Sequence, residues 1–331
     1  MRTGVRHPAG ARFLGPTRGP SRRLVWAVAV AAEVGVVLLA LASVPAFAAS
    51  TEPAYAGDFP DPFVLAPAAG ETTYWAYSTG SGRRNLQVMH SDDLRTWKDL
   101  ADPLPVLPPW ASPGHTWAPG VLRQGDTYLM YYTARHTASG RQCIGLATAQ
   151  APGGPFTDES QRPLICQRLR GGSIDPNPFV APDGTRYLLW KSDDNVHWLP
   201  SSLWGQRLSA DGRSLTGPVT RLLTLSRLWQ APTIEGPTMV AVDGTYYLFY
   251  GANDSDGGNA AIGYAVCRGP LGPCTNASTT GPWMASHDAV VGPSGPAVFT
   301  DAEGSTRLAY HAWWNGSATP PVASARCGST R

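Results

Sequence analysis

Three carboxylic acids in this sequence share one local setting, although they are far apart along the chain. Asp61, Asp175 and Glu235 each precede a short apolar run, in DPFV, DPNPFV and EGPTMV. Trp117 in WAPGV and Ser294 in SGPAV occupy the same place in two further copies of the pattern. If these five residues surround one opening, three carboxylates converge there. Because like charges repel one another, such a cluster indicates that a reaction uses it.

Hydrolysis of a glycosidic bond is a reaction that needs carboxyl groups in this arrangement. A protonated acid supplies the leaving oxygen with its proton, and an ionised one activates water on the opposite face of the sugar. A third carboxylate near the acid raises its pKa by like-charge repulsion and helps it keep the proton near neutral pH. A single Asp-Pro or Glu-Gly-Pro is weak evidence, because such dipeptides are common in turns.

The runs that would position these acids recur with a nearly constant period. Their second members begin at Tyr74, Tyr128, Tyr187, Tyr247 and, more loosely, Arg307, in steps of 54, 59, 60 and 60 residues. Each repeat has about four short strands, the number in one propeller blade. The pattern therefore predicts an all-β fold, a five-bladed β-propeller. A β-sandwich is the alternative, and it is disfavoured because the pattern recurs five times at nearly constant spacing.

The fifth repeat ends early. After Trp314 the sequence SATPPVASARCGSTR lacks alternating apolar residues, so the fifth blade is predicted to be incomplete at the C-terminus. A propeller protects its strand edges by completing the ring, so closure and stability depend on this repeat. An inactive product of a truncated reading frame is the corresponding alternative.

Residues 1–48 have the pattern of a secretory signal peptide. Two arginines precede an apolar run over residues 24–41, and the tripeptide AFA at 46–48 forms an A-x-A cleavage site. We expect cleavage after Ala48, which leaves residues 49–331 as a single secreted catalytic domain. The apolar run is long enough that an uncleaved membrane anchor is the alternative.

Most of the positive charge lies in this leader. It holds six of the 26 basic residues and one of the 24 acidic residues, so the rest of the chain has 20 basic and 23 acidic residues, a charge of −3. A domain with this charge has no electrostatic footprint for nucleic acid. We expect it to be a monomer.

Four of the five cysteines are predicted to form disulfides, as suits an exported chain. Cys267 and Cys274 flank a turn, and Cys143 and Cys166 bracket the exit from the second repeat. We pair them in this way and leave Cys327 unpaired. Metal ligation is the weaker alternative, because no CxxC or His-rich spacing accompanies the cysteines.

The motifs of this chain resemble those of the family 43 glycoside hydrolases. The matching stretches, in order, are FPDPFV at Asp61, WAP at Trp117, GSIDPNPFV at Asp175, IEGPTMV at Glu235 and YHAW at His311. The resemblance implies a five-bladed propeller that hydrolyses arabinofuranosides or β-xylosides with inversion and without an organic cofactor. It further implies that Asp61 is the general base, Glu235 the general acid and Asp175 the residue that tunes the pKa of the acid. Gly120 departs from the pattern, because the family usually places an acid there.

Two further residues are candidates for substrate binding. Trp117 could stack on the C–H face of a sugar ring, and ordinary packing between blades is the equal alternative. By resemblance to the arabinan-cleaving members, His311 would help hold the substrate, or a structural calcium or other ion on the propeller axis. A core histidine is the alternative, because one imidazole without carboxylate partners is a weak calcium signal.

The first functional hypothesis is a secreted inverting hydrolase that removes terminal α-L-arabinofuranosyl residues from arabinan or arabinoxylan. Its partner would be a plant cell-wall polysaccharide or oligosaccharide. A β-xylosidase or an endo-arabinanase is the alternative within the family. A retaining fructosidase-like propeller, which shares the architecture but attacks through a carboxylate nucleophile, is an alternative outside it. From a different class, a non-catalytic carbohydrate-binding propeller is disfavoured by the acid trio, because a lectin needs no protonated carboxyl group.

Overall fold

The computed structural model describes residues 53–255, 257–314 and 326–330. The strands in these residues form five antiparallel sheets, joined by loops that contain three short 3-10 helices. Within the described ranges no helix is long and apolar enough to cross a membrane. The predicted signal peptide, residues 1–48, lies outside the described residues.

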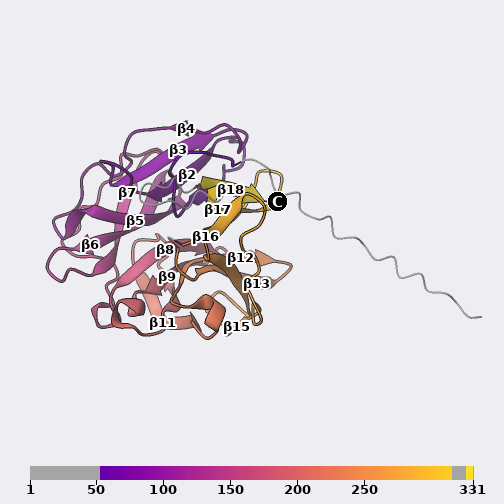
Figure 1. Ribbon diagram of the computed structural model, residues 1–331. Coiled ribbons are helices and arrows are strands. Elements are labelled where there is room, and N and C mark those ends of the chain that lie inside the picture. The colour runs from indigo at the N-terminus through magenta and orange to yellow at the C-terminus, as the bar shows by residue number, and fades with distance from the viewer. Residues whose placement is uncertain (1–52, 256, 315–325, 331) are drawn as a thin grey trace, which may run out of the picture. The chain divides into compact units, whose positions relative to one another are not determined.

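The chain builds the five sheets one after another in sequence order (Figure 1). The first sheet contains β1 (Phe63–Leu65), β2 (Tyr74–Thr79), β3 (Leu86–Ser91) and β4 (Lys98–Asp99). The second contains β5 (Ala111–Gln124), β6 (Thr127–His136) and β7 (Gln142–Ala149). The third contains β8 (Ser173–Val180), β9 (Arg186–Ser192), β10 (Ser202–Leu208) and β11 (Leu215–Thr224).

The fourth and fifth sheets follow the same order. The fourth contains β12 (Ile234–Val242), β13 (Thr245–Ala252), β14 (Ala261–Cys267) and β15 (Cys274–Asn276), and the fifth contains β16 (Val290–Thr300), β17 (Thr306–Trp314) and β18 (Arg326–Thr330). The three 3-10 helices are η1 (Arg168–Arg170), η2 (Asp194–His197) and η3 (Leu228–Gln230). The second and the fifth sheet each have three strands, so within the described residues strand number does not set the fifth sheet apart.

The residues that mark the repeat all lie in the second strand of a sheet. They are Tyr74 in β2, Tyr128 in β6, Tyr187 in β9, Tyr247 in β13 and Arg307 in β17. A second strand pairs on both sides, and its neighbouring sheets cover both of its faces, so its sequence is apolar almost throughout. β8 pairs antiparallel with β9, and the turn between these two strands contains Asp183 and Gly184.

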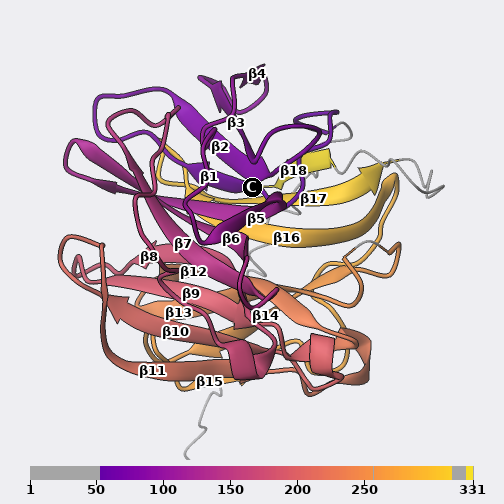
Figure 2. The ribbon, with the colours of Figure 1, turned by 90° about the vertical axis from the view of Figure 1, so that its left-hand side faces the viewer.

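Five hydrophobic clusters of the described residues hold neighbouring sheets together. Tyr77 of the first sheet and Met130 of the second belong to one cluster. The other clusters join the second sheet to the third, the third to the fourth and the fourth to the fifth. Ala76 and Phe299 belong to the cluster between the first and the fifth sheet, and Figure 2 shows β16 and β17 beside the strands of the first sheet. The sheets therefore close into a ring, and the chain folds as an all-β propeller.

The first strands of the sheets lie at the centre of this ring, where each contacts the next. Within or just before each of these strands, one residue before a proline has a left-handed backbone conformation, with φ between 40° and 58°. These residues are Asp61, Ala118, Asp175, Gly236 and Gly295. Aspartate and glycine tolerate this conformation better than most residues do. The five dipeptides line an axial cavity of about 30 Å³.

This shared backbone geometry corrects the alignment made from the sequence. Asp61 and Asp175 occupy the left-handed position, as aligned. Trp117, Glu235 and Ser294 lie one residue before it, so they are not structural equivalents of the two aspartates. The sequence alignment followed the polar residue, whereas the backbone follows the residue that precedes proline.

Both predicted disulfides are confirmed: Cys143 is bonded to Cys166, and Cys267 to Cys274. The first bond ties β7 to the loop that leads to β8, and the second joins β14 to β15. Both cross-links restrict the chain between strands of this framework. Cys327 lies in β18.

Gly120 lies where the second and third sheets approach each other closely. A Cβ atom added at this position would lie 2.5 Å from Cδ of Pro178 and 2.6 Å from the carbonyl oxygen of Pro176. Real Cβ atoms do not come so near to backbone atoms. The glycine that departs from the sequence motif is therefore required by packing against β8.

We predict that Gly120→Ala lowers the free energy of unfolding by about 1–3 kcal/mol, because the added methyl group overpacks the contact between the sheets. Urea denaturation of the purified protein measures this loss. Gly281→Ala is the matched control, because a Cβ atom there would meet nothing within 4 Å. Equal stability of the two variants would contradict this account of Gly120.

Candidate active site

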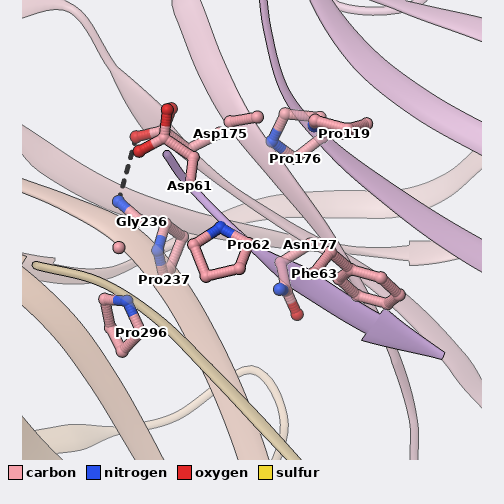
Figure 3. Close-up of a pocket in the computed structure, with 12 residues that line it drawn as sticks. Asp61, Pro62, Phe63, Pro119, Asp175, Pro176, Asn177, Gly236, Pro237 and Pro296 are labelled. Atoms are coloured by element: carbon pink, nitrogen blue, oxygen red, sulfur yellow. Dashed lines mark hydrogen bonds between the residues drawn. The ribbon is translucent and has the colours of Figure 1, made fainter. Parts of the chain in front are cut away.

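Asp61, Asp175, Glu235 and Trp117 line one cavity of about 370 Å³. This active-site cavity shares Asp61 and Asp175 with the axial cavity, so it lies at one end of the propeller axis. Figure 3 shows both aspartates together with the prolines that surround the axis. Ser294, the fifth residue of the predicted ring, is buried and does not line the cavity, whereas its neighbour Gly295 does.

Asp61 is held by residues from two other positions in the ring. Its Oδ2 accepts a hydrogen bond of 2.6 Å from the hydroxyl of Thr79 at the end of β2. The same hydroxyl oxygen accepts a hydrogen bond of 2.9 Å from the backbone N–H of Ala118 in the second sheet. The backbone N–H of Asp61 donates to Nδ1 of His311 at 2.9 Å. The first, second and fifth sheets thus fix this carboxylate together.

Asp175 is held in a corresponding way. Its backbone N–H donates to the Thr133 hydroxyl of β6 at 3.1 Å, and its Oδ2 accepts the backbone N–H of Gly236 at 2.9 Å. Figure 3 marks the second of these bonds. A carboxylate that bridges two neighbouring sheets has little freedom to turn.

Glu235 contacts a lysine that the sequence analysis missed. Oε2 of Glu235 accepts from Nζ of Lys191 at 3.2 Å, and Asp193 holds the same Nζ at 3.1 Å. Lys191 lies in β9 and is 1% exposed. Its only sequence signal is a charge directly after the apolar segment YLLW, inside a predicted strand. A lysine is almost never buried without such partners.

The charges of this group shift two pKa values. The pKa of Asp175 is raised well above its ordinary value, first by burial of its carboxyl group and then by the negative charge of Glu235. Lys191 and the Gly236 N–H oppose this rise, and Asp61 adds to it. Burial alone would lower the pKa of Lys191, but Glu235, Asp193 and Asp175 together raise it. The cavity therefore retains a carboxyl proton at a pH where an ordinary aspartate has lost it.

The two aromatic candidates take different places. Trp117 is half-buried on the cavity wall, with its ring 6.3 Å from that of His115 in an edge-to-face arrangement. His311 is 6% exposed and lies behind Asp61, with Nδ1 3.6 Å from Asp61 Oδ1. Because Nδ1 accepts the Asp61 backbone N–H, that nitrogen carries no proton. His311 thus contacts Asp61 and is not among the residues that line the active-site cavity.

The ion expected on the propeller axis stays a prediction. In the described part of the chain, no group of three or more His, Cys, Asp or Glu side chains lies in a geometry that could hold a metal ion. The axial cavity of about 30 Å³ has room for only one or two water-sized particles. His311 remains a predicted ligand, with Nδ1 already engaged by Asp61.

The arrangement provides what proton transfer to and from a bound sugar needs. It has three carboxyl groups around one cavity, one retained proton and one buried cation. The Asp61 side chain is 36% exposed, and the Glu235 side chain is 18% exposed. The first can therefore meet water, whereas the second is held against Lys191.

We predict that Asp175→Asn gains stability relative to the unmodified protein as the pH rises from about 4, the ordinary value for aspartate, to 7. A raised folded-state pKa means that the folded protein binds more protons than the unfolded chain over this window, so the unmodified protein loses stability there. Asparagine keeps the acceptor for Gly236 and tolerates the left-handed backbone. Urea denaturation at several pH values measures the difference.

The control is Asp243→Asn, because Asp243 is exposed and has a similar φ of 49°. A stability difference between Asp175→Asn and the unmodified protein that stays constant from pH 4 to pH 7 would contradict the raised pKa.

Comparison with known proteins gives a consistent result. The sequence model of the family "Glycosyl hydrolases family 43" matches residues 50–330. The chain is 29% identical over 266 residues to a probable arabinan endo-1,5-alpha-L-arabinosidase A of Aspergillus flavus, with 73% of this chain and 78% of that protein covered. It is 28% identical over 224 residues to an arabinoxylan arabinofuranohydrolase of Bacillus subtilis, with 57% of this chain and 40% of that protein covered.

The fold has matching solved structures as well. The crystal structure of a thermostable family-43 glycoside hydrolase superposes with a TM-score of 0.72 at 26% identity, and the match covers 86% of this chain and 91% of that one. An endo-arabinase from Bacteroides thetaiotaomicron, at 20% identity and a TM-score of 0.68, shares the fold. Because the family match extends over most of the sequence, the chain belongs to glycosyl hydrolases family 43.

Proposed function

We propose that the five sheets are the five blades of one propeller and that the fifth blade is complete enough to close it. The proposal is supported by the cluster that Ala76 and Phe299 share and by the contact between β1 and β16. The incomplete fifth blade expected from the sequence is then a blade of three strands, as in the second sheet.

This family 43 glycosidase, we propose, removes terminal α-L-arabinofuranosyl residues from arabinan or arabinoxylan with inversion. The observation that carries the proposal is the single cavity that Asp61, Asp175 and Glu235 line, each from a different sheet. Its volume lies near the lower end of the range for ligand sites, about 300–1,000 Å³, which suits one terminal sugar. The names of the arabinan and arabinoxylan relatives support this substrate class.

In the proposed reaction Asp61 is the general base. Its carboxylate takes a proton from the water that attacks the anomeric carbon, and the hydroxyl of Thr79 holds Oδ2 during that step. His311 fixes the Asp61 backbone from behind. The relatively exposed position of the Asp61 side chain leaves room for the attacking water.

Glu235 is the proposed general acid, and it gives its proton to the leaving oxygen as the glycosidic bond breaks. Asp175 assists because like-charge repulsion disfavours ionisation of both carboxyl groups together, and in the proposed mechanism the proton that this pair retains stands on Glu235 when the bond breaks. Lys191 holds Oε2 of Glu235, which leaves Oε1 as the oxygen that can carry and donate the proton. The lysine charge also compensates the new carboxylate after proton transfer.

An endo-acting arabinanase is the second candidate. It is favoured by the A. flavus relative, whose name states endo action and of which the chain covers 78%. The products from linear arabinan distinguish the two activities, because an exo-acting enzyme releases arabinose and an endo-acting one releases oligosaccharides.

We further propose that the chain is exported after removal of residues 1–48 and works as a monomer. The two disulfides support export, because such bonds persist in oxidising compartments. No step of the proposed mechanism uses an organic cofactor or an axial ion.

Glu235→Gln is expected to lower kcat on arabino-oligosaccharides by about 10²–10⁴-fold, because glutamine cannot donate the proton to the leaving oxygen. Reducing-sugar release measures turnover, and calorimetric titration with the same oligosaccharide measures binding, which is expected to survive. Full turnover by the variant would show that the acid is another residue. Product of retained configuration, seen by NMR in the first turnovers, would refute the inverting mechanism.

Lys191→Met is expected to lower kcat/KM on arabino-oligosaccharides by about 10²-fold, because the acid loses the group that positions it. Loss of activity on a nitrophenyl arabinofuranoside is expected to be much smaller, since nitrophenolate leaves without a proton. The ratio of the two losses distinguishes positioning of the acid from mere damage to the fold. Equal losses on both substrates would show that Lys191 acts only on stability or on substrate binding.

A further inference from the structure

A second cavity, of about 310 Å³, lies beside the active-site cavity and is lined by residues of the second and third sheets and their loops. Trp117 lines both cavities, so its side chain forms part of the boundary between them. The second cavity is nearly as large as the first and falls within the usual size of ligand sites, about 300–1,000 Å³. We call it the flanking cavity.

The flanking cavity lies on the side of the proposed acid. Asp193, which lines it, binds Nζ of Lys191 at 3.1 Å, and the same Nζ binds Oε2 of Glu235 at 3.2 Å. Two consecutive ion pairs therefore connect the proposed proton donor to the wall of this cavity. An acid stands next to the oxygen that it protonates, and that oxygen belongs to the leaving part of the substrate. The leaving part thus extends toward the flanking cavity and across Trp117.

The charges around the flanking cavity favour an anion. Arg135 and Arg141 line it, and among the described residues neither guanidinium lies within ion-pair distance of a carboxylate. The one acid on its wall, Asp193, is already bound to Lys191. Nη1 of Arg135 lies 3.2 Å from Nε2 of His115, and since arginine can only donate, the imidazole nitrogen is the acceptor of this hydrogen bond.

We propose that the flanking cavity is a subsite for a uronic acid on the leaving side of the substrate. The carboxylate of the uronic acid would bind Arg135 and Arg141, which suit planar bidentate recognition of carboxylates. The ring of Trp117 offers an apolar face for the sugar that carries it. This proposal rests on the proposed function, because the leaving side is defined by Glu235 as the acid.

The test compares two matched oligosaccharides as substrates. One is an arabinosylated xylo-oligosaccharide with a glucuronic acid on the xylose next to the arabinosylated one, and the other is its carboxyl-reduced analogue. The unmodified protein is expected to favour the acidic substrate in kcat/KM by about tenfold at low salt, a difference of about 1.4 kcal/mol. High salt is expected to reduce this preference, because it screens partly exposed charges.

The double variant Arg135→Gln, Arg141→Gln is expected to lose the preference. Both arginines are at least partly exposed, so the substitutions leave the core intact. Arg213→Gln is the matched control, because it removes an exposed arginine that lines neither cavity, and it is expected to keep the preference. Binding of methyl glucuronide and methyl glucoside to each protein, measured by NMR titration, gives a readout that needs no turnover.

The outcomes separate this proposal from the proposed function. A ratio near one in the unmodified protein, or a preference that survives in the double variant, overturns the uronic acid subsite. Cleavage of an aryl arabinofuranoside without cleavage of either oligosaccharide also overturns it, while the glycosidase itself stands. A protein that cleaves none of these substrates but binds the glucuronide through both arginines overturns the proposed reaction and keeps the anionic sugar site.

Discussion

Hydrogen bonds between neighbouring sheets, made where the first strands meet at the axis, are the interaction on which the rest of this structure depends. Thr79 of the first sheet binds the backbone of Ala118 in the second, and Thr133 of the second binds the backbone of Asp175 in the third. His311 of the fifth sheet binds the backbone of Asp61. In each case a residue of a second strand holds the neighbouring sheet at the point where the chain of that sheet takes a left-handed conformation. The same few bonds therefore position the sheets and aim the carboxylates.

Between the third and fourth sheets the contact is made by a charged side chain instead of a hydroxyl or an imidazole. Lys191 reaches from the end of β9 to Glu235 of the fourth sheet, and Asp193 balances its charge. Placing three carboxylates around one cavity without a cation would be costly, because the ions lose part of their water and repel one another. The lysine makes the cluster tolerable, whereas the raised pKa of Asp175 shows that the cost is not fully offset. Because part of this electrostatic cost remains, the site keeps a proton on one of its carboxyl groups.

The sequence predicted the all-β propeller and the two disulfides, because repeats of fixed period and cysteines beside turns are local signals. It also predicted the group of Asp61, Asp175, Glu235 and Trp117 that lines one cavity. It misaligned Trp117, Glu235 and Ser294 by one position, although a residue before proline recurs in all five repeats and would have given the correct alignment. Lys191 was missed because a lysine in a strand normally indicates a solvent-exposed face, and only the packed structure shows its two partners.

The bond between His311 and Asp61 joins residues 250 positions apart in the chain. A ribosome delivers Asp61 early and His311 only after four further sheets have been made, and domains generally begin to fold from the N-terminal side during synthesis. In a nascent chain Asp61 is thus present long before the His311 side chain that accepts its backbone N–H and fixes its position. Maturation of the site is timed by the final repeat, so partial products of translation carry the acids without the assembled centre.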